Sequence, residues 1–279
     1  MLKTIKNTFV LINKNLWLLF LFMTICYLGI VYFSILKASA NSIAALLFGF
    51  LTLLLIAVAG IAGFFGTLRS TVEKVENPIK CFTKSVGEYF LSSVGILFIY
   101  SIISFLIFIT VVVTGTKIIG MFSFSLDDLA KAFESVEALT AFQNNISEAD
   151  LLKLSQWHLL YIAITSIVTF LFIHWIPEVF FKTKNPFVAL YEALKKMFYN
   201  ALKTFQLFLT VVVFNMIFSI IVAFLLLVPQ LEIFVYFIYF YGLLFIVTLI
   251  FEFYNENFVS QPIMNAVEKV ELDEGGEEQ

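Results

Sequence analysis

Two pairs of ionisable residues stand at the ends of long apolar runs, where a charged side chain is costly. His174 and Glu178 lie four residues apart in HWIPE, and Glu252 and Glu256 lie four apart in FEFYNEN. That spacing places both members of a pair on one helical face. Ionisable groups at membrane depth are candidates for binding a proton, a cation or a lipid headgroup, and histidine titrates near neutral pH. These four residues form our candidate polar vestibule.

A third pair with the same spacing, Arg69 and Glu73, ends another apolar run. A ring of such pairs would make a vestibule on one side of a membrane. The competing interpretation, which we favour, is that polar residues collect where helices leave the hydrocarbon, a level that Trp175 and Tyr254 also mark. Under that interpretation the pairs belong to the ends of the spans and bind no ligand.

The sequence offers little support for catalysis. It shows no nucleophilic triad, no metal-binding helix of the H-E-x-x-H type and no glycine loop that would cradle a phosphate. Its cysteines and histidines do not have the spacing of metal ligands. We therefore expect no cofactor, no metal and no nucleic-acid partner, and we lean against an enzyme.

Composition decides the class of protein. Hydrophobic residues make up 61% of the 279 positions, and charged residues only 13%. A soluble domain needs a charged surface, which takes about a quarter of its residues. Lipid must therefore solvate much of this chain. The sequence predicts an integral membrane protein, an all-α polytopic bundle whose first partner is the lipid bilayer.

Six stretches are long and apolar enough to cross a bilayer core, which takes about 20 residues of helix. The first stretch follows several lysines and resembles a signal peptide. Its apolar run is longer than the usual stretch of about 7–15 residues, so we interpret it as a retained helix. The predicted spans are 16–36, 43–66, 91–115, 159–181, 206–228 and 231–252.

Lysine and arginine are distributed unequally between the two sides that these spans define. Most of them lie before the first span, after the second and after the fourth. Positively charged loops stay in the cytoplasm. We therefore expect a multi-pass protein of the cytoplasmic membrane with both termini inside the cell. The acidic end, residues 268–279, is expected to be a disordered cytoplasmic tail.

One pattern occurs twice in the chain. ENPIKCFTKSVGEYF (76–90) and KNPFVALYEALKKMF (184–198) share Asn-Pro and an apolar stripe at helical spacing. Each predicts an amphipathic helix, capped by Asn77 or Asn185, that runs into a span. We favour a helix in the headgroup layer near anionic inner-leaflet lipid, and a core-facing elbow is the alternative. The basic residues placed at this interface are Lys80, Lys84, Lys195 and Lys196.

A fainter copy begins the chain, where Phe9, Leu16 and Trp17 fit the same stripe. We infer three parallel repeats, each an amphipathic helix followed by two spans, within a single membrane domain over residues 1–267. Repeats of this kind all start on the same side of the membrane. The predicted repeats are about 3–70, 76–181 and 184–256.

The middle repeat carries an insertion, residues 116–157. Within it, Ser125 is expected to begin a short helix, because Asp127 and Asp128 favour the first turn. Ser147 is expected to begin a second one, because Asp150 follows three residues later. We favour a helical cap over the outer end of the bundle. A lid for a partner or a substrate is the alternative.

The stretch NPFVALYEALKKMFYNALKTFQLFL, with six spans and short outer hairpins, resembles a diffuse group of six-span prokaryotic membrane proteins. The group includes the membrane domain attached to some glycerophosphodiester phosphodiesterases. The resemblance implies a prokaryotic cytoplasmic-membrane protein. It carries over no catalytic residue, and the sequence contains no soluble phosphodiesterase part.

Together these features favour a non-enzymatic membrane protein that acts in envelope or lipid homeostasis. The alternative is a transporter or channel for a small molecule or an ion, with the candidate vestibule at its cytoplasmic end. An intramembrane lipid enzyme ranks third.

Overall fold

The computed structural model describes residues 1–38, 42–74, 78–132 and 135–260, and every regular element in these ranges is a helix. Six of the described helical stretches are long and apolar enough to cross a membrane. The predicted all-α polytopic membrane bundle is confirmed. Two predictions, the cap at Asn77 and the acidic tail 268–279, fall outside the described residues.

The observed spans follow the predicted ones in order, and most of them are longer. Polar residues near the ends of the apolar runs continue the helices, so hydropathy alone placed several ends too early. The spans are Trp17–Leu36, Ile43–Val72, Lys80–Ile118, Glu148–Thr183, Ala201–Leu226 and Phe234–Val259.

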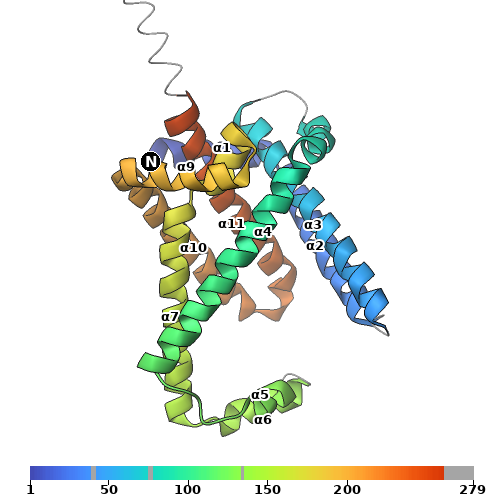
Figure 1. The fold of residues 1–279 in the computed structure, drawn as a ribbon, viewed down its shortest axis with the longest axis vertical. Helices are drawn as coiled ribbons and strands as arrows, with labels where there is room; N and C mark the ends of the chain where they lie inside the picture. The colour runs from blue at the N-terminus through green and yellow to red at the C-terminus, as the bar shows by residue number, and fades with distance from the viewer. Residues whose placement is uncertain (39–41, 75–77, 133–134, 261–279) are drawn as a thin grey trace, which may run out of the picture. The chain divides into compact units, whose positions relative to one another are not determined.

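Figure 1 shows the helices along the chain, with short π-helical and 3₁₀ turns (η) between some of them. The α-helices are α1 (Leu2–Lys14), α2 (Trp17–Ala38), α3 (Ile43–Val72), α4 (Pro78–Ile118), α5 (Leu126–Ala132), α6 (Val136–Asn145), α7 (Glu148–Phe172), α8 (Trp175–Glu178), α9 (Pro186–Tyr199), α10 (Ala201–Leu226) and α11 (Glu232–Tyr254). The turns are η1 (Val179–Thr183, π), η2 (Pro229–Leu231, 3₁₀) and η3 (Asn255–Val259, π).

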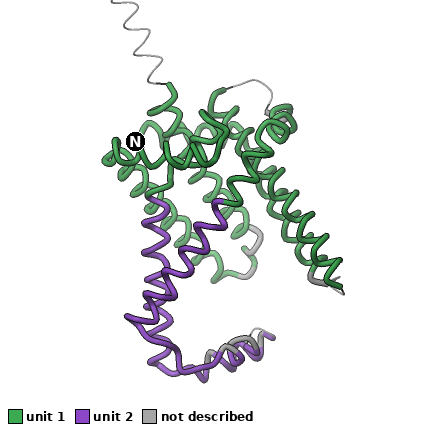
Figure 2. The backbone as a smooth tube through the Cα atoms, in the orientation of Figure 1, with its two compact units in different colours: residues 1–98, 171–279 green, residues 99–170 purple. Residues whose placement is uncertain are grey.

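The chain divides into two compact units (Figure 2). Unit 1 takes in residues 1–98 and 171–279, and unit 2 takes in residues 99–170. Helices α4 and α7 each contribute to both units.

Helix α11 lies at the centre of unit 1, where it contacts α1, α2, α3 and α10. Its inward side chains are fully or almost fully buried and consist mainly of large apolar groups. Within lipid, van der Waals packing of such side chains between helices is what stabilises the arrangement. The core residues of α11 are Leu244, Phe245, Leu249, Phe251, Phe253 and Tyr254.

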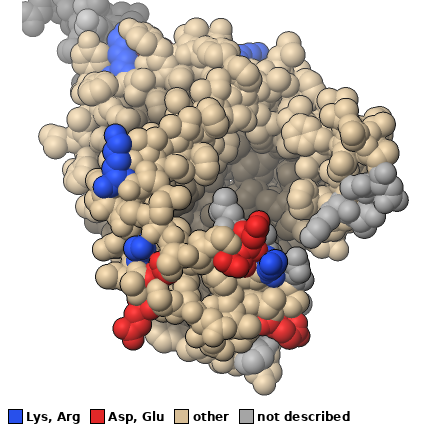
Figure 3. All heavy atoms as spheres, turned by 60° about the horizontal axis from the view of Figure 1, so that its bottom comes forward, with Lys and Arg blue, Asp and Glu red and all other residues tan. Residues whose placement is uncertain are grey.

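The surface of the spans is apolar. Large side chains such as Phe48, Phe98 and Phe224 are more than half exposed. Figure 3 shows one face of the molecule, on which charged side chains form small separate groups and uncharged atoms cover the rest. A surface of this kind is matched by lipid and not by water.

Two short helices, α1 and α9, each end at an asparagine that precedes a span. The two asparagines have similar backbone conformations. Asn15 has φ −127° and ψ 48°, and Asn200 has φ −124° and ψ 37°. Each side-chain amide donates to the carbonyl four residues earlier, at 2.8 Å for Asn15 and 3.3 Å for Asn200. Each side chain thus provides a donor for a carbonyl in the last turn of the helix, where backbone donors run out. Figure 1 shows α9 lying across the end of α10.

The middle copy of the pattern differs, because its predicted elbow is continuous with α4. Its first turns are seen nearly end-on in Figure 1, whereas the following turns run across the view. Small residues of α3 allow these first turns to approach closely. A Cβ on Gly63 would lie 2.3 Å from the Phe82 ring, and one on Gly66 would lie 2.3 Å from the Cβ of Ser85. The threefold repeat stays a prediction.

The asparagine cap at the start of α9 is confirmed. The Asn185 side chain accepts from the backbone N–H groups of Phe187, at 3.0 Å, and Val188, at 3.4 Å. Pro186 occupies the first helical turn, where a missing N–H has no cost.

Unit 2 contains the inserted segment 116–157. The predicted cap at Ser125 is confirmed, because its hydroxyl accepts from the backbone N–H of Asp128 at 3.1 Å. The prediction of a short helix beginning at Ser147 was wrong in length, because the helix that begins there is α7, which continues to Phe172. The helix continues because residues 148–172 contain no glycine or proline that would end it. A further cap at Ser135 begins α6, which we did not predict.

Candidate functional site

Glu178 is the most strongly engaged of the predicted residues. Its carboxylate is 3% exposed and accepts from the ammonium group of Lys196 on α9 and from the hydroxyl of Tyr254 on α11. The Lys196 ammonium also lies 3.1 Å from the Tyr254 oxygen. The three groups join three elements of unit 1 through one buried ion pair. Leaving one partner of such a pair alone usually costs about 3–5 kcal/mol.

An interruption in the helix places this carboxylate. Helix α7 ends at Phe172, and the chain resumes helical structure at Trp175 and then widens into the π-helical turn η1. Pro177 has no N–H to donate, which explains part of the break. The indole of Trp175 donates to the Pro186 carbonyl at 2.9 Å and so fixes the start of α9 against this turn. π-Helical turns occur frequently at functional sites.

His174 has a different set of neighbours. Its imidazole is fully buried, and its Nε2 lies 3.0 Å from the Thr204 hydroxyl on α10. The ring stands beside Phe253 and Phe258. Its Nδ1 has no hydrogen-bond partner among the residues that the structure describes. The structure therefore directs His174 toward α10 and Glu178 toward α9, although the two are four residues apart.

The second predicted pair also separates. Glu252 is buried on α11, and its Oε2 has no hydrogen-bond partner within the described part of the chain. The Glu256 carboxylate accepts from the Thr4 hydroxyl at 2.7 Å and from the Asn7 amide at 2.9 Å, both on α1. Helix α1 is thus tied through neutral donors to η3, the turn that follows α11.

Sequence reasoning missed the role of Tyr89. The Arg69 guanidinium donates to the Tyr89 hydroxyl, which in turn donates to the Phe180 carbonyl at 3.0 Å. Arg69 also pairs with Glu73 at 3.1 Å. Tyr89 thus supplies a side-chain donor to one carbonyl of the π-helical turn. Tyr89 falls on the apolar stripe of residues 76–90 that the sequence indicates, and its hydroxyl was the one signal of a polar partner.

A second donor from α4 completes the same turn. Ser92 donates to the Lys184 carbonyl at 2.5 Å, where the backbone is left-handed with φ 53°. The Lys184 ammonium pairs with Glu88 at 2.7 Å, and that carboxylate raises the pKa of the lysine. Side chains of α4 therefore hold the segment between η1 and α9 at Phe180 and at Lys184.

The four predicted interface lysines fall into two groups. Lys80, Lys84 and Lys195 are exposed. Lys196, by contrast, has a side chain that is only 19% exposed and points inward to Glu178. A buried carboxylate within reach attracts this ammonium group away from the surface.

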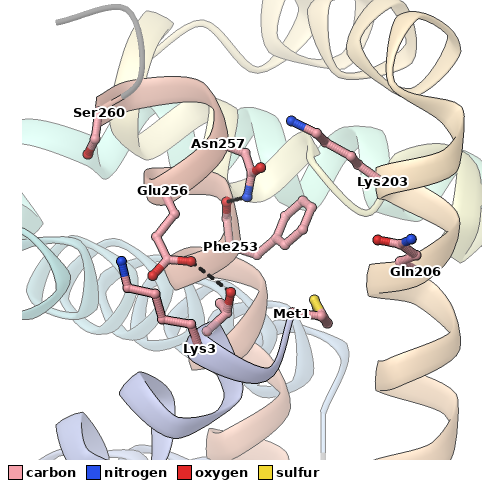
Figure 4. A pocket seen from close by; sticks show the side chains of 9 residues that line it. Met1, Lys3, Lys203, Gln206, Phe253, Glu256, Asn257 and Ser260 are labelled. Atoms are coloured by element: carbon pink, nitrogen blue, oxygen red, sulfur yellow. Dashed lines mark hydrogen bonds between the residues drawn. The ribbon is translucent and has the colours of Figure 1, made fainter. Parts of the chain in front are cut away.

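An open pocket lies beside Glu256 (Figure 4), with a cavity volume of about 460 Å³. It falls within the range of about 300–1,000 Å³ that is usual for ligand sites. Its walls come from α1, from the start of α10 and from the end of α11 with η3. The lining residues are Met1, Lys3, Thr4, Lys203, Gln206, Phe253, Glu256, Asn257 and Ser260.

No group of three or more metal-ligating side chains occurs among the described residues. No family model, no curated protein and no solved structure matches the chain.

Proposed function

We propose that the protein is a non-catalytic membrane protein of the cell membrane that engages the lipid surface through α9 and acts in envelope or lipid homeostasis. The observation that carries the proposal is the outward face of α9. Phe187, Tyr191 and Phe198 lie four and seven residues apart and are 57%, 65% and 72% exposed. The spacing puts them on one helical face.

The opposite face of α9 is already covered by protein. Ala189, Ala193 and Met197 are buried against unit 1, and Lys196 is held by Glu178. The aromatic face therefore has no role in holding the bundle together. Aromatic rings next to a basic residue such as Lys195 match the boundary between headgroups and acyl chains. The proposal combines the two interpretations from the sequence. One face of α9 packs on the core, as in the elbow, and the exposed face engages the headgroup layer.

The buried polar groups support a structural role over catalysis. The Glu178 carboxylate already accepts hydrogen bonds from Lys196 and Tyr254 within the bundle. Arg69 and Tyr89 are likewise engaged with backbone and side-chain partners of their own.

Lipid retention tests the proposal. The full chain is extracted in mild detergent, and the lipids that remain bound are identified by mass spectrometry and compared with the bulk membrane. We expect a selected set of phospholipids on the wild type and fewer on a Tyr191→Lys, Phe198→Lys variant. Leu152→Lys, which changes an exposed apolar residue of unit 2, is the matched control. Equal retention by all three proteins would contradict the proposal.

One observation favours the transporter alternative. His174 Nδ1 and Glu252 Oε2 are buried polar atoms without a partner among the described residues, and such atoms call for an explanation. Proteoliposome flux of protons and monovalent cations, with His174→Ala and Glu252→Gln, tests this alternative. Flux by the wild type that both variants lose would favour a transporter, and no flux above empty liposomes would reject transport of these ions.

A further inference from the structure

The pocket beside Glu256 has cationic side chains contributed by two separate elements. Lys3 stands on α1 and Lys203 on the first turn of α10, and both are exposed. Neither forms an ion pair with any residue that the structure describes. Gln206, one turn after Lys203, adds an amide to the same wall, as Figure 4 shows. Lysine ammonium groups without internal partners are suited to bind a phosphate.

The pocket also presents a fixed negative charge. Thr4 and Asn7 donate to the two oxygens of Glu256 and hold the carboxylate in place, but both donors are neutral. No cationic group lies within ion-pair distance of Glu256 in the described part of the chain. Figure 4 shows Lys203 and Glu256 on different walls of the pocket. The carboxylate would repel a simple anion in this pocket, and the lysines would repel a simple cation.

The pocket lies at the ends of two spans, the level at which lipid headgroups are found. Lys203 belongs to the first turn of the span Ala201–Leu226, and Glu256 to the last turn of the span Phe234–Val259. Phe253, which also lines the pocket, is buried in the bundle. The pocket therefore stands where the helices leave the hydrocarbon.

We propose that this pocket binds the headgroup of a phospholipid that carries both a phosphate and a primary ammonium group, as phosphoethanolamine does. Lys203 contacts the phosphate, and Glu256, on the other wall, accepts hydrogen bonds from the ammonium group. The inference rests on the proposed function and names the lipid class that this end of the protein selects.

Calorimetric titration of the purified full chain in detergent micelles tests this assignment, with short-chain phosphatidylethanolamine as the probe. Three further probes separate the parts of the headgroup. Phosphatidylcholine keeps the phosphate but has no N–H donor, phosphatidylglycerol has no ammonium group, and glycerophosphoethanolamine has no acyl chains. We expect phosphatidylethanolamine to bind most tightly of the four.

The variants are Lys203→Gln and Glu256→Gln, with Lys14→Gln as the matched control on an exposed lysine of α1 outside the pocket. Losing one charge-assisted contact weakens binding on the order of tenfold. We expect that loss of phosphatidylethanolamine affinity in both pocket variants and none in the control. Glu256→Gln should lose the preference over phosphatidylglycerol, because the carboxylate is what distinguishes the two lipids. Unliganded melting temperatures establish that each variant is folded.

Equal affinity for the three lipids, or equal behaviour of Lys203→Gln and Lys14→Gln, would overturn the proposal. Glycerophosphoethanolamine binding as tightly as the lipid would reject the membrane source and assign the pocket to a soluble phosphoester. Lipid retention that depends on Tyr191 and Phe198 while the pocket variants behave as wild type would reject this inference alone and leave the proposed function standing.

Discussion

The ammonium group of Lys196 donates to the carboxylate of Glu178, and this contact joins α9 to the interrupted end of the fourth span. Lys195, the preceding residue, is exposed. Two adjacent lysines of the same helix thus have different roles. One stabilises the bundle, and the other remains at its surface.

Replacing Lys196 with Met should lower the free energy of unfolding by about 3 kcal/mol, because it leaves Glu178 buried without its cation. Lys195→Met is the control, and its effect should stay within about 0.5 kcal/mol. Urea unfolding in detergent micelles, followed by circular dichroism, measures both. Similar losses for the two variants would show that the pair does not stabilise the fold.

Removing the hydroxyl of Tyr89 should also destabilise the protein. Tyr89→Phe deletes the donor to the Phe180 carbonyl and the acceptor for Arg69, at a cost of about 1–3 kcal/mol. Tyr100→Phe, on an exposed tyrosine of the same helix, should have almost no effect. Thermal melting of the three proteins in one detergent makes the comparison, and an unchanged melting temperature for Tyr89→Phe would refute the bridge.

Two glycines should respond in opposite directions to the same substitution. Gly66→Ala places a Cβ against Ser85 and should cost about 1–3 kcal/mol, because that contact lies next to the backbone. Gly87→Ala meets open space in a helix and should stabilise by about 0.5–1 kcal/mol. Melting temperatures give the signs. A stabilised Gly66→Ala protein would mean that α3 and α4 are not in close contact there.

The topology predicts opposite labelling at two surface positions. With Cys26 and Cys81 replaced by Ser, Ser135→Cys should react with an impermeant maleimide added outside intact cells. Lys195→Cys should react only after the cells are opened. The reason is that an odd number of predicted spans separates the two positions. Labelling of both positions from the same side would contradict the span between them, and labelling of position 195 alone from outside would overturn the orientation.

The number and order of spans followed from the sequence, because a lipid environment demands long apolar helices and little else. The cap at Asn185 also followed, since its hydrogen bonds involve only the next few residues. These features depend on local chemistry or on the solvent, and both can be recognised from residue types.

The partners of the candidate site residues could not be predicted in the same way. Helical spacing placed His174 and Glu178 on one face, and a regular helical hydrogen bond does join their backbones, but α10 supplies the partner of one side chain and α9 that of the other. The inward turn of Lys196 depends on how α9 is rotated against the core. That rotation is set by the small side chains Ala189 and Ala193, whose role becomes visible only in three dimensions.

The most direct test of lipid engagement by α9 is the accessibility of a spin label in lipid nanodiscs. Labels on Tyr191→Cys and Lys195→Cys, in a background without Cys26 and Cys81, are compared by their collision rates with oxygen and with a water-soluble nickel chelate. The proposal predicts oxygen-dominated relaxation at position 191 and chelate-dominated relaxation at position 195. Equal access of the chelate to both positions would show that the aromatic face of α9 points into water, and the proposed function would fall.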